Sequence, residues 1–301
     1  MKEKKFLNTN ELIDCIKQKG IIIDNEAQVA DILNNENYYV LFGYKALFTD
    51  KNGNYKPNTN FMDIYKLSQF DRKLRILFFD TILTIENKVK VSIITNFCSK
   101  YGYKETDFLD ISNYNSNHKY LTKTFAIMNR QIEEKKYNHL AILHYEQEYG
   151  FVPLWVYMKL FTFGLVKEIY NILKDDDKQI IKDNISNDKS ISIKNLFTMI
   201  HLLVDTRNDC GHDEIVYNHI HRRIKISRTI YHKPFNNPYQ GKGDMLAKLI
   251  SIKYFLSKDK YNEFIDKFTN LIDEFIKTSN ISKDDLLREM HLSNNYEDLK
   301  W

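Results

Sequence analysis

The six residues Arg207-Asn208-Asp209-Cys210-Gly211-His212 offer the combination of side chains best suited to a chemical reaction. An imidazole exchanges protons near neutral pH, so His212 can take a proton from a ribose 2′-hydroxyl or give one to a leaving 5′-oxygen. A guanidinium stays positively charged, so Arg207 can hold non-bridging phosphate oxygens as charge builds on them. This pair is suited to RNA cleavage without a metal ion.

The spacing of the pair requires a particular local structure. Five steps along a straight α-helix are a rotation of about 140°, so Arg207 and His212 would not share a face. A bend or a helix end near Cys210 and Gly211 could bring them together. The alternative without a catalytic role is an arginine near a helix C-terminus followed by a surface histidine. A nucleophilic pair of Cys210 and His212 is disfavoured, because residues two apart on a helix point away from each other.

Positive charge is concentrated just after these six residues. The net charge of +4 is modest, but four of the eight arginines fall between residues 207 and 233. From Ile215 to Gly243 there are six lysines and arginines and no aspartate or glutamate. The planar guanidinium suits phosphate, so this stretch is a candidate RNA-binding region. A basic surface helix and loop is the alternative.

Metal, cofactor and membrane signals are weak. The sequence has no H-E-x-x-H motif, no carboxylate–histidine cluster at helical spacing and no glycine-rich phosphate loop. His219 and His221 are two apart, which suits one face of a strand but not of a helix. We therefore expect no metal and no cofactor. The three cysteines are far apart, which fits a reducing cytoplasm, and neither a secretory signal nor an apolar run of membrane-spanning length is visible.

The elements that must position these residues are helical. Apolar residues recur at three- and four-residue steps through most of the chain, and glycine and proline are few. The aromatic stretch from Tyr38 to Tyr44 either packs in the core, which we favour, or stacks on bases. The pattern predicts an all-α fold of about nine to eleven helices. Helices are expected over residues 10–19, 24–33, 62–100 (one long helix or two abutting ones), 118–136, 154–173 (with Pro153 as the first helical residue), 174–184, 192–204 (capped by Ser190 or Ser192), 244–256, 260–277 and 282–290.

Four ordered blocks resemble the Abi-like proteins of bacterial abortive infection, the AbiD and AbiF group, from about residue 10 to about 220. The blocks are Cys15 to Gly20 with Asn37-Tyr38-Tyr39 and Gly43-Tyr44; Ile64-Tyr65 and Phe70 to Arg75 with Ile85 to Lys88; His144-Tyr145 with Pro153-Leu154-Trp155 and Phe163-Gly164; and Arg207 to His212. The fourth block departs from the family pattern Arg-Asn-x-x-Ala-His, because Gly211 replaces the alanine. Asp213-Glu214 then follow where a second histidine or a serine is common.

The resemblance implies a HEPN-type helical bundle in which Arg207 and His212 map onto the HEPN ribonuclease motif. It implies a toxin-like role in phage defence and, because the chain has one such motif, a homodimer with a composite site. A small noncoding RNA partner is also implied. We expect one domain over residues 1–301, with an N-terminal extension (1–60), a core (61–232) and C-terminal helices (233–301).

Together these observations predict a metal-independent endoribonuclease. In this reading His212 transfers protons, Arg207 stabilises the phosphorane and Asn208 positions one of them. Further RNA-backbone contacts are expected from four side chains, namely Arg222, Arg223, Lys225 and Arg228. The alternative is a protein that binds and sequesters a small RNA without cutting it.

Overall fold

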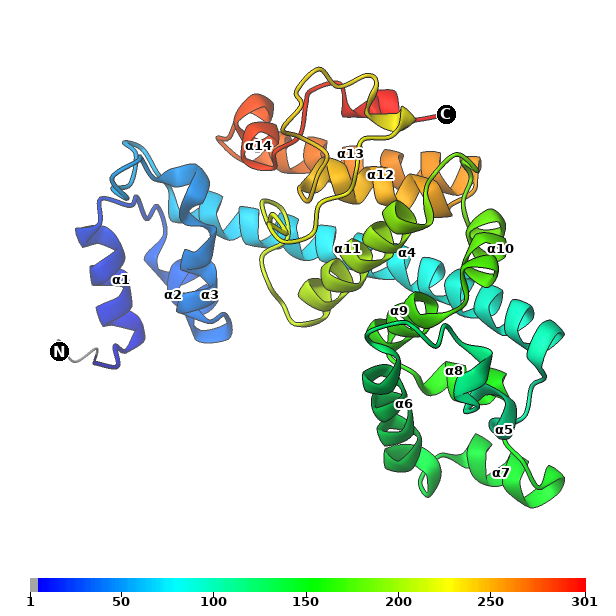
Figure 1. Ribbon diagram of the computed structural model, residues 1–301. Helices are drawn as coiled ribbons and strands as arrows, with labels where there is room; N and C mark the ends of the chain where they lie inside the picture. Colours follow the sequence, from blue (N-terminus) through cyan, green and yellow to red (C-terminus); the bar gives the residue numbers. More distant parts are fainter. Residues whose placement is uncertain (1–4) are drawn as a thin grey trace.

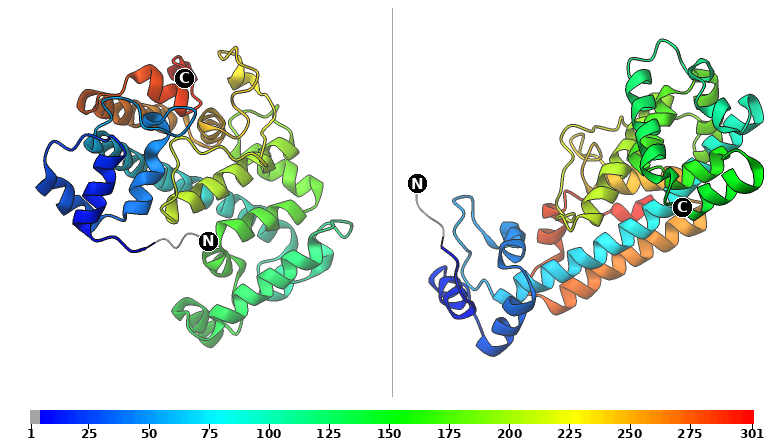
Figure 2. Two further views of the ribbon diagram at one scale, coloured as in Figure 1. Left: turned by 90° about the vertical axis from the view of Figure 1, so that its left-hand side faces the viewer. Right: turned by 90° about the horizontal axis from the view of Figure 1, so that it is seen from below.

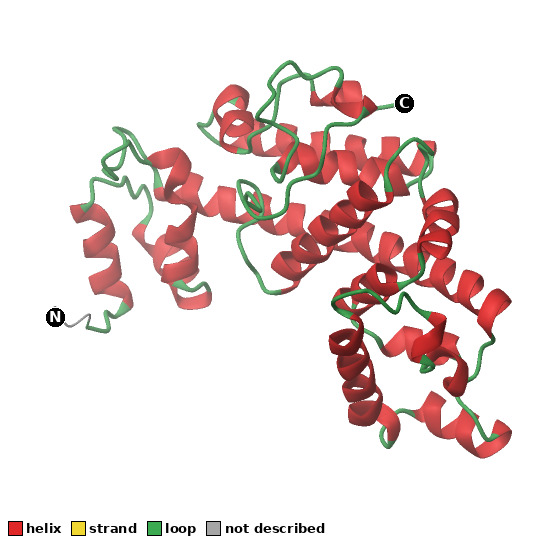
Figure 3. Ribbon diagram, in the orientation of Figure 1, coloured by secondary structure: helices red, strands yellow, loops and turns green. Residues whose placement is uncertain are grey.

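The structure, a computed structural model, describes residues 5–301, and its regular elements in that range are helices (Figure 1). Fourteen α-helices are joined by loops and short 3-10 turns, and no strand occurs among these residues (Figure 3). Pairing of the β type is limited there to two isolated bridges, Ile22 with Asn60 and Thr49 with Tyr55. The all-α prediction is confirmed.

The helix bounds follow the sequence pattern closely in most places. They are α1 Thr9–Gln18, α2 Glu26–Asn35, α3 Tyr38–Leu41, α4 Phe61–Tyr101, α5 Glu105–Phe108, α6 Leu121–Lys136, α7 Leu140–Tyr149, α8 Leu154–Leu160, α9 Phe163–Ile172, α10 Asp175–Ile185, α11 Ile193–Gly211, α12 Met245–Phe255, α13 Lys258–Thr278 and α14 Lys283–Glu289.

Helix α4 is the central element of the fold. It is a single helix of 41 residues, because no glycine or proline interrupts it. The Asn60 side chain caps its start by accepting the Met62 amide at 2.8 Å, and Gly102, with φ 104°, follows its end. Its buried side chains lie on several faces, which allows it to pack against α8 to α13.

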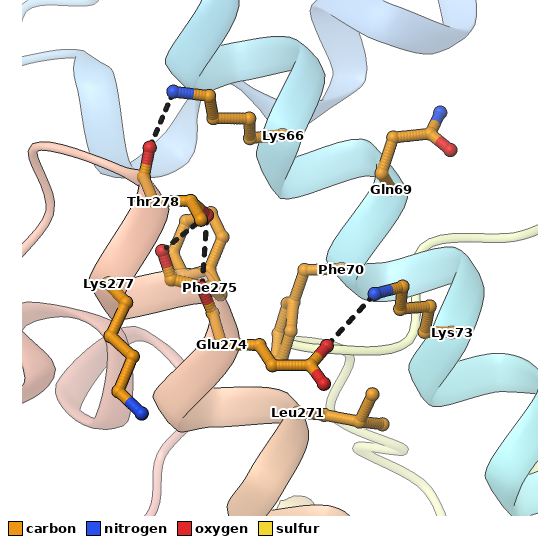
Figure 4. Close-up of a pocket in the computed structure, with 9 residues that line it drawn as sticks. All are labelled: Lys66, Gln69, Phe70, Lys73, Leu271, Glu274, Phe275, Lys277 and Thr278. Carbon is orange, nitrogen blue, oxygen red and sulfur yellow. Dashed lines mark hydrogen bonds and ion pairs between the residues drawn. The ribbon is translucent and has the colours of Figure 1, made fainter.

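Helix α13 runs antiparallel beside α4, as the right-hand view of Figure 2 shows. The pairing is fixed at one end by an ion pair of 3.0 Å between Lys73 and Glu274, and within the seam by Phe70 and Phe275, whose ring centroids are 5.2 Å apart. A shallow pocket opens along this seam, with these aromatic rings beneath polar side chains of both helices (Figure 4). None of its lining residues belongs to the Arg207–His212 stretch.

The prediction of one helix over residues 154–173 is wrong, because this stretch forms two helices, α8 and α9. Phe161 is extended, with φ −69° and ψ 133°, and the Thr162 hydroxyl caps α9 by accepting the Leu165 amide at 3.3 Å. A capping threonine competes with the helical backbone, and the apolar periodicity alone does not reveal this break. Pro153 correspondingly precedes α8 as its N-cap instead of being its first residue.

The buried apolar side chains form one cluster that extends from Ile13 in α1 to Leu299 near the C-terminus. Tyr44, from the aromatic stretch after α2, is part of it, whereas Tyr39 is 78% exposed. Most of that stretch therefore packs as core. No helix of the described chain combines the length and apolar character needed to cross a membrane.

Candidate active site

Helix α11 carries Arg207 and Asn208 in its last turns. Of the two candidate caps, Ser190 and Ser192, the structure uses Ser192, whose hydroxyl accepts the Asn195 amide at 3.1 Å. It ends at Gly211, and His212 is the capping residue with φ −102° and ψ 13°. The His212 amide still donates to the Asn208 carbonyl at 2.9 Å, so the helical hydrogen bonding extends to His212 and the helix end does not by itself bring His212 onto the face of Arg207.

The chain turns sharply after the helix end. The Glu214 amide donates to the Asp209 carbonyl at 3.0 Å, and Asp213 takes the left-handed conformation with φ 59°. This pattern is a Schellman-type C-cap, in which glycine is the usual left-handed residue. Aspartate tolerates this conformation better than most side chains. The turn leaves His212 exposed beyond the helix.

Arg207 is half-buried against α4. Its guanidinium lies over the Phe79 ring, 5.3 Å from the centroid, and Nη1 donates to Asn208 Oδ1 in a long contact of 3.5 Å. Its Nε atom is buried and has no hydrogen-bond partner among the described residues. A buried donor without a partner is costly, so this group is available to an anion that reaches it. No hydrogen bond joins Arg207 to His212 within residues 5–301.

Sequence reasoning missed the residues that fix the turn after His212. The fully buried Asp71 carboxylate accepts the Tyr217 amide at 2.7 Å and the Val216 amide at 3.2 Å. It also accepts the Tyr44 hydroxyl at 2.9 Å and Arg75 Nη1 at 2.7 Å. Four donors from three separate parts of the chain thus converge on one carboxylate.

Arg75 connects this network to the turn itself, because its other terminal nitrogen pairs with Asp213. Burial raises the pKa of Asp71 above its usual range, whereas Arg75, Tyr44 and the two backbone amides lower it. The only signal in the sequence was an aspartate and an arginine four residues apart on one predicted helix.

Cys210 is not suited to act as a nucleophile. Burial raises the pKa of its thiol to about 12, so the reactive thiolate is disfavoured. The sequence spacing also disfavours a nucleophilic pair of Cys210 and His212, because residues two apart on a helix point away from each other.

The basic segment (residues 215–243) is an ordered loop with almost no regular structure. It doubles back on itself, since the His221 amide donates to the Gly243 carbonyl and the Ile226 amide to the Lys242 carbonyl, both at 2.9 Å. A side chain at Gly243 would lie 2.5 Å from the His221 carbonyl oxygen, so glycine is required there. The loop's path is therefore fixed by backbone contacts.

The four predicted RNA contacts in this segment differ in their surroundings. Arg222, Arg223 and Lys225 are exposed, and within residues 5–301 no carboxylate forms an ion pair with them. Arg228 is also exposed, but its Nη2 donates to the carbonyls of His232 at 3.3 Å and Phe235 at 3.2 Å. Part of its function is therefore to hold the loop.

The basic segment returns to α11 near both ends of the helix. Near its start the Ser227 amide donates to Asn195 Oδ1 at 2.8 Å, and the second contact lies in its last turns. His221 Nε2 lies 3.2 Å from Asp209 Oδ2, and His219 lies beside His221 with ring centroids 4.5 Å apart. A carboxylate and two histidines thus meet at Asp209, a residue that lies between Arg207 and His212 in the sequence, although the sequence shows no such cluster at helical spacing. Asp209 was not anticipated because the loop, and not a helix face, brings the three together.

A family model described as Abi-like protein matches residues 31–218, which is more than half of the chain. The chain belongs to the Abi-like protein family. Membership implies a role in abortive infection, a form of phage defence. The match includes the blocks around Asp71 and Arg207 but not the residues from Cys15 to Gly20. Neither a curated protein nor a solved structure matches the chain.

Proposed function

We propose that this Abi-like protein is a metal-independent endoribonuclease of the HEPN class, acting as a toxin-like effector in the cytoplasm. The observation that carries the proposal is the state of Arg207, which is half-buried with an unpartnered Nε and lies five residues before the exposed His212. A cation with an unused donor and a proton-transfer group are the two components that phosphoryl transfer needs.

In the proposed reaction the ribose 2′-oxygen attacks the adjacent phosphorus, and the bond from phosphorus to the 5′-oxygen breaks. His212 takes the proton from the 2′-hydroxyl or gives one to the leaving oxygen. Arg207 holds the non-bridging oxygens, and Asn208, which accepts from Arg207 at 3.5 Å, positions it. The products are a 2′,3′-cyclic phosphate and a 5′-hydroxyl.

One histidine serves as acid or base in a given step, so a second protomer would supply the other role. Helix α4 offers a surface for this homodimer. Ile76 is 64% exposed and Leu83 is 40% exposed, and both lie at helical spacing from Phe79, which contacts Arg207. An apolar face beside the site supports a partner that covers it.

The basic segment provides the proposed contacts with RNA, including a small noncoding RNA partner. Arg222 and Arg223 follow His221, which touches the turn between Arg207 and His212. Exposed guanidinium groups next to the site suit the backbone of single-stranded RNA.

The direct test measures cleavage of RNA by purified protein in EDTA. The wild type should cut at least about 100-fold faster than Arg207→Ala or His212→Ala, since positioned proton transfer or oxyanion stabilisation each contributes that much. Arg130→Ala and His144→Ala are matched controls, because both residues are exposed on other helices. Equal rates for the wild type and the two site variants would contradict the assignment.

A second candidate function is sequestration of a small RNA without cleavage. The free basic side chains of the segment favour it independently of the Arg207–His212 pair. It predicts that His212→Ala leaves the cellular phenotype and the salt-sensitive RNA binding intact. Toxicity that disappears with His212→Ala but persists with His144→Ala would exclude it.

The homodimer is tested by light scattering at micromolar concentration, with and without RNA. We expect the mass of a dimer for the wild type and the mass of a monomer for the double variant Ile76→Asp with Leu83→Asp. Burying two carboxylates in an apolar interface would carry a large desolvation cost. A monomer mass for the wild type under both conditions would contradict the composite site.

A further inference from the structure

Asp209, His219 and His221 form a cluster of side chains that the proposed cleavage does not use. Asp209 lies in the last turns of α11, and the two histidines belong to the basic segment. Each offers one ligand atom, and these atoms all lie within 4.8 Å of one another. The cluster joins the end of α11 to the basic segment, whose other hydrogen bonds to this helix lie near the helix start, between Asn195 and Ser227.

The separation of Asp209 and His221 matches that of two ligands around a bound transition-metal ion. In a tetrahedral zinc site, nitrogen and oxygen ligands lie about 2.0 to 2.2 Å from the ion, which puts two ligands about 3.4 Å apart. Asp209 Oδ2 and His221 Nε2 are 3.2 Å apart. His219 completes the set after a shift of about an ångström, and its side chain is exposed enough to move.

The two closest ligand atoms lack hydrogen bonds. Both Asp209 Oδ2 and His221 Nε2 are buried without a hydrogen-bond partner among the described residues, and their mutual contact does not have hydrogen-bond geometry. The His221 side chain is only 7% exposed. Two unpartnered polar atoms aimed at one point indicate that something else satisfies them there.

The backbone holds the ligands in place. The His221 amide donates to the Gly243 carbonyl at 2.9 Å, and the Lys248 ammonium donates to the His219 carbonyl at 3.1 Å. Asp209 is held by α11 and by the bond from the Glu214 amide to its carbonyl. A site preorganised from both sides loses little conformational entropy when an ion binds.

We propose that Asp209, His219 and His221 bind a divalent transition-metal cation of the zinc class. Two imidazoles and one carboxylate suit zinc, and the exposed side of His219 leaves room for a water molecule as the fourth ligand. The ion fastens the basic segment to the end of α11. It takes no part in bond breaking, so the inference stands independently of the ribonuclease activity.

The test titrates ZnCl2 into the full-length, untagged protein after chelator dialysis, using calorimetry and metal analysis. One ion should bind per chain with a micromolar or lower dissociation constant, and zinc should raise the melting temperature. Cobalt(II) in the same site should give the visible absorption of a tetrahedral complex. Asp209→Asn, His219→Gln and His221→Gln should each weaken zinc binding about 100-fold, while His144→Gln binds like the wild type.

His219→Gln keeps the test interpretable, because its side chain is exposed and the variant should fold even if His221→Gln does not. Absence of zinc binding by the wild type, or unchanged zinc binding by His219→Gln with Asp209→Asn, would overturn the proposal. Ion content and melting temperature are read without RNA, so failure of the metal site is distinguishable from failure of the ribonuclease assignment.

Discussion

The turn after α11 and the basic segment that follows it are adjacent in sequence but are held in opposite ways. The turn and the first residues of the basic segment are fixed through side chains, since buried Asp71 accepts the Val216 and Tyr217 amides and Arg75 pairs with Asp213. From His219 onward the basic segment is fixed by its own backbone contacts and by the Asn195 side chain, which accepts the Ser227 amide at 2.8 Å, and its arginines at 222 and 223 face solvent. Chemistry needs a histidine at a defined position, whereas phosphate binding tolerates mobile charge.

The largest effect should come from removing the anchor of the turn. Asp71→Ala leaves Arg75 without its buried partner, which costs about 3 to 5 kcal/mol in the free energy of unfolding. Denaturant unfolding measures this. Asp80→Ala is the control, because Asp80 is exposed on the same helix and should change the value by less than about 0.5 kcal/mol. Equal stability of the two variants would mean that the network does not hold the turn.

The corresponding change in the basic segment should affect binding and leave the fold intact. Arg222→Ala with Arg223→Ala should lower the slope of log affinity for single-stranded RNA against log salt by about 1.4, the value for two phosphate contacts. Fluorescence anisotropy across a salt series measures this slope, and the melting temperature should not change. Arg228→Ala should instead lower the melting temperature, because its guanidinium holds two loop carbonyls. An unchanged salt dependence would contradict the assignment of the two arginines to the RNA-binding surface.

Acid should loosen the basic segment before it affects the turn. Burial lowers the pKa of His232 below the ordinary 6.5, and its Nδ1 accepts the Thr229 amide at 2.9 Å, which requires the neutral ring. Between the lowered value and about 6.5 the unfolded chain binds the extra proton, so stability falls as pH drops through this window. The protection factors for amide hydrogen exchange over residues 229–241, which are corrected for the intrinsic pH dependence of exchange, should therefore fall on acidification. His232→Gln should flatten this pH dependence, and an identical pH profile in both proteins would argue against the role of His232.

The smallest effect concerns Gly211 at the helix end. A Cβ atom there would meet Phe79 at 3.5 Å, an ordinary contact, and Gly211 has no positive φ. Gly211→Ala should stabilise the protein by about 0.5 to 1 kcal/mol, because glycine is the poorer helix former. Thermal unfolding measures the gain. A destabilised variant would show that the turn requires glycine.

Local patterns predicted most of the fold, because periodicity and caps are visible within ten to twenty residues. The long α4, the Ser192 cap and the helix after it followed from such signals. The break between α8 and α9 was not predicted, because a threonine cap inside an apolar run leaves the spacing of the apolar residues unchanged. The existence of α7, in a stretch without clear periodicity, was also not predicted.

The site was predictable only as far as its residues are neighbours in sequence. Arg207 and His212 carry their chemistry in their types and spacing. The contacts of Asp71 with the turn join residues 145 and 146 positions apart, and no sequence rule pairs them. The meeting of Asp209 with His221 likewise depends on the path of a loop, which periodicity does not describe.

The chemical form of the RNA ends tests the central claim most directly. RNA incubated with the wild-type protein in EDTA should yield fragments that end in a 2′,3′-cyclic phosphate and begin with a 5′-hydroxyl. DNA of the same sequence should stay intact, because it lacks the 2′-hydroxyl, and His212→Ala should give no such fragments. Fragments with 5′-phosphate ends, or cyclic phosphates formed equally by His212→Ala, would contradict the roles assigned to Arg207 and His212.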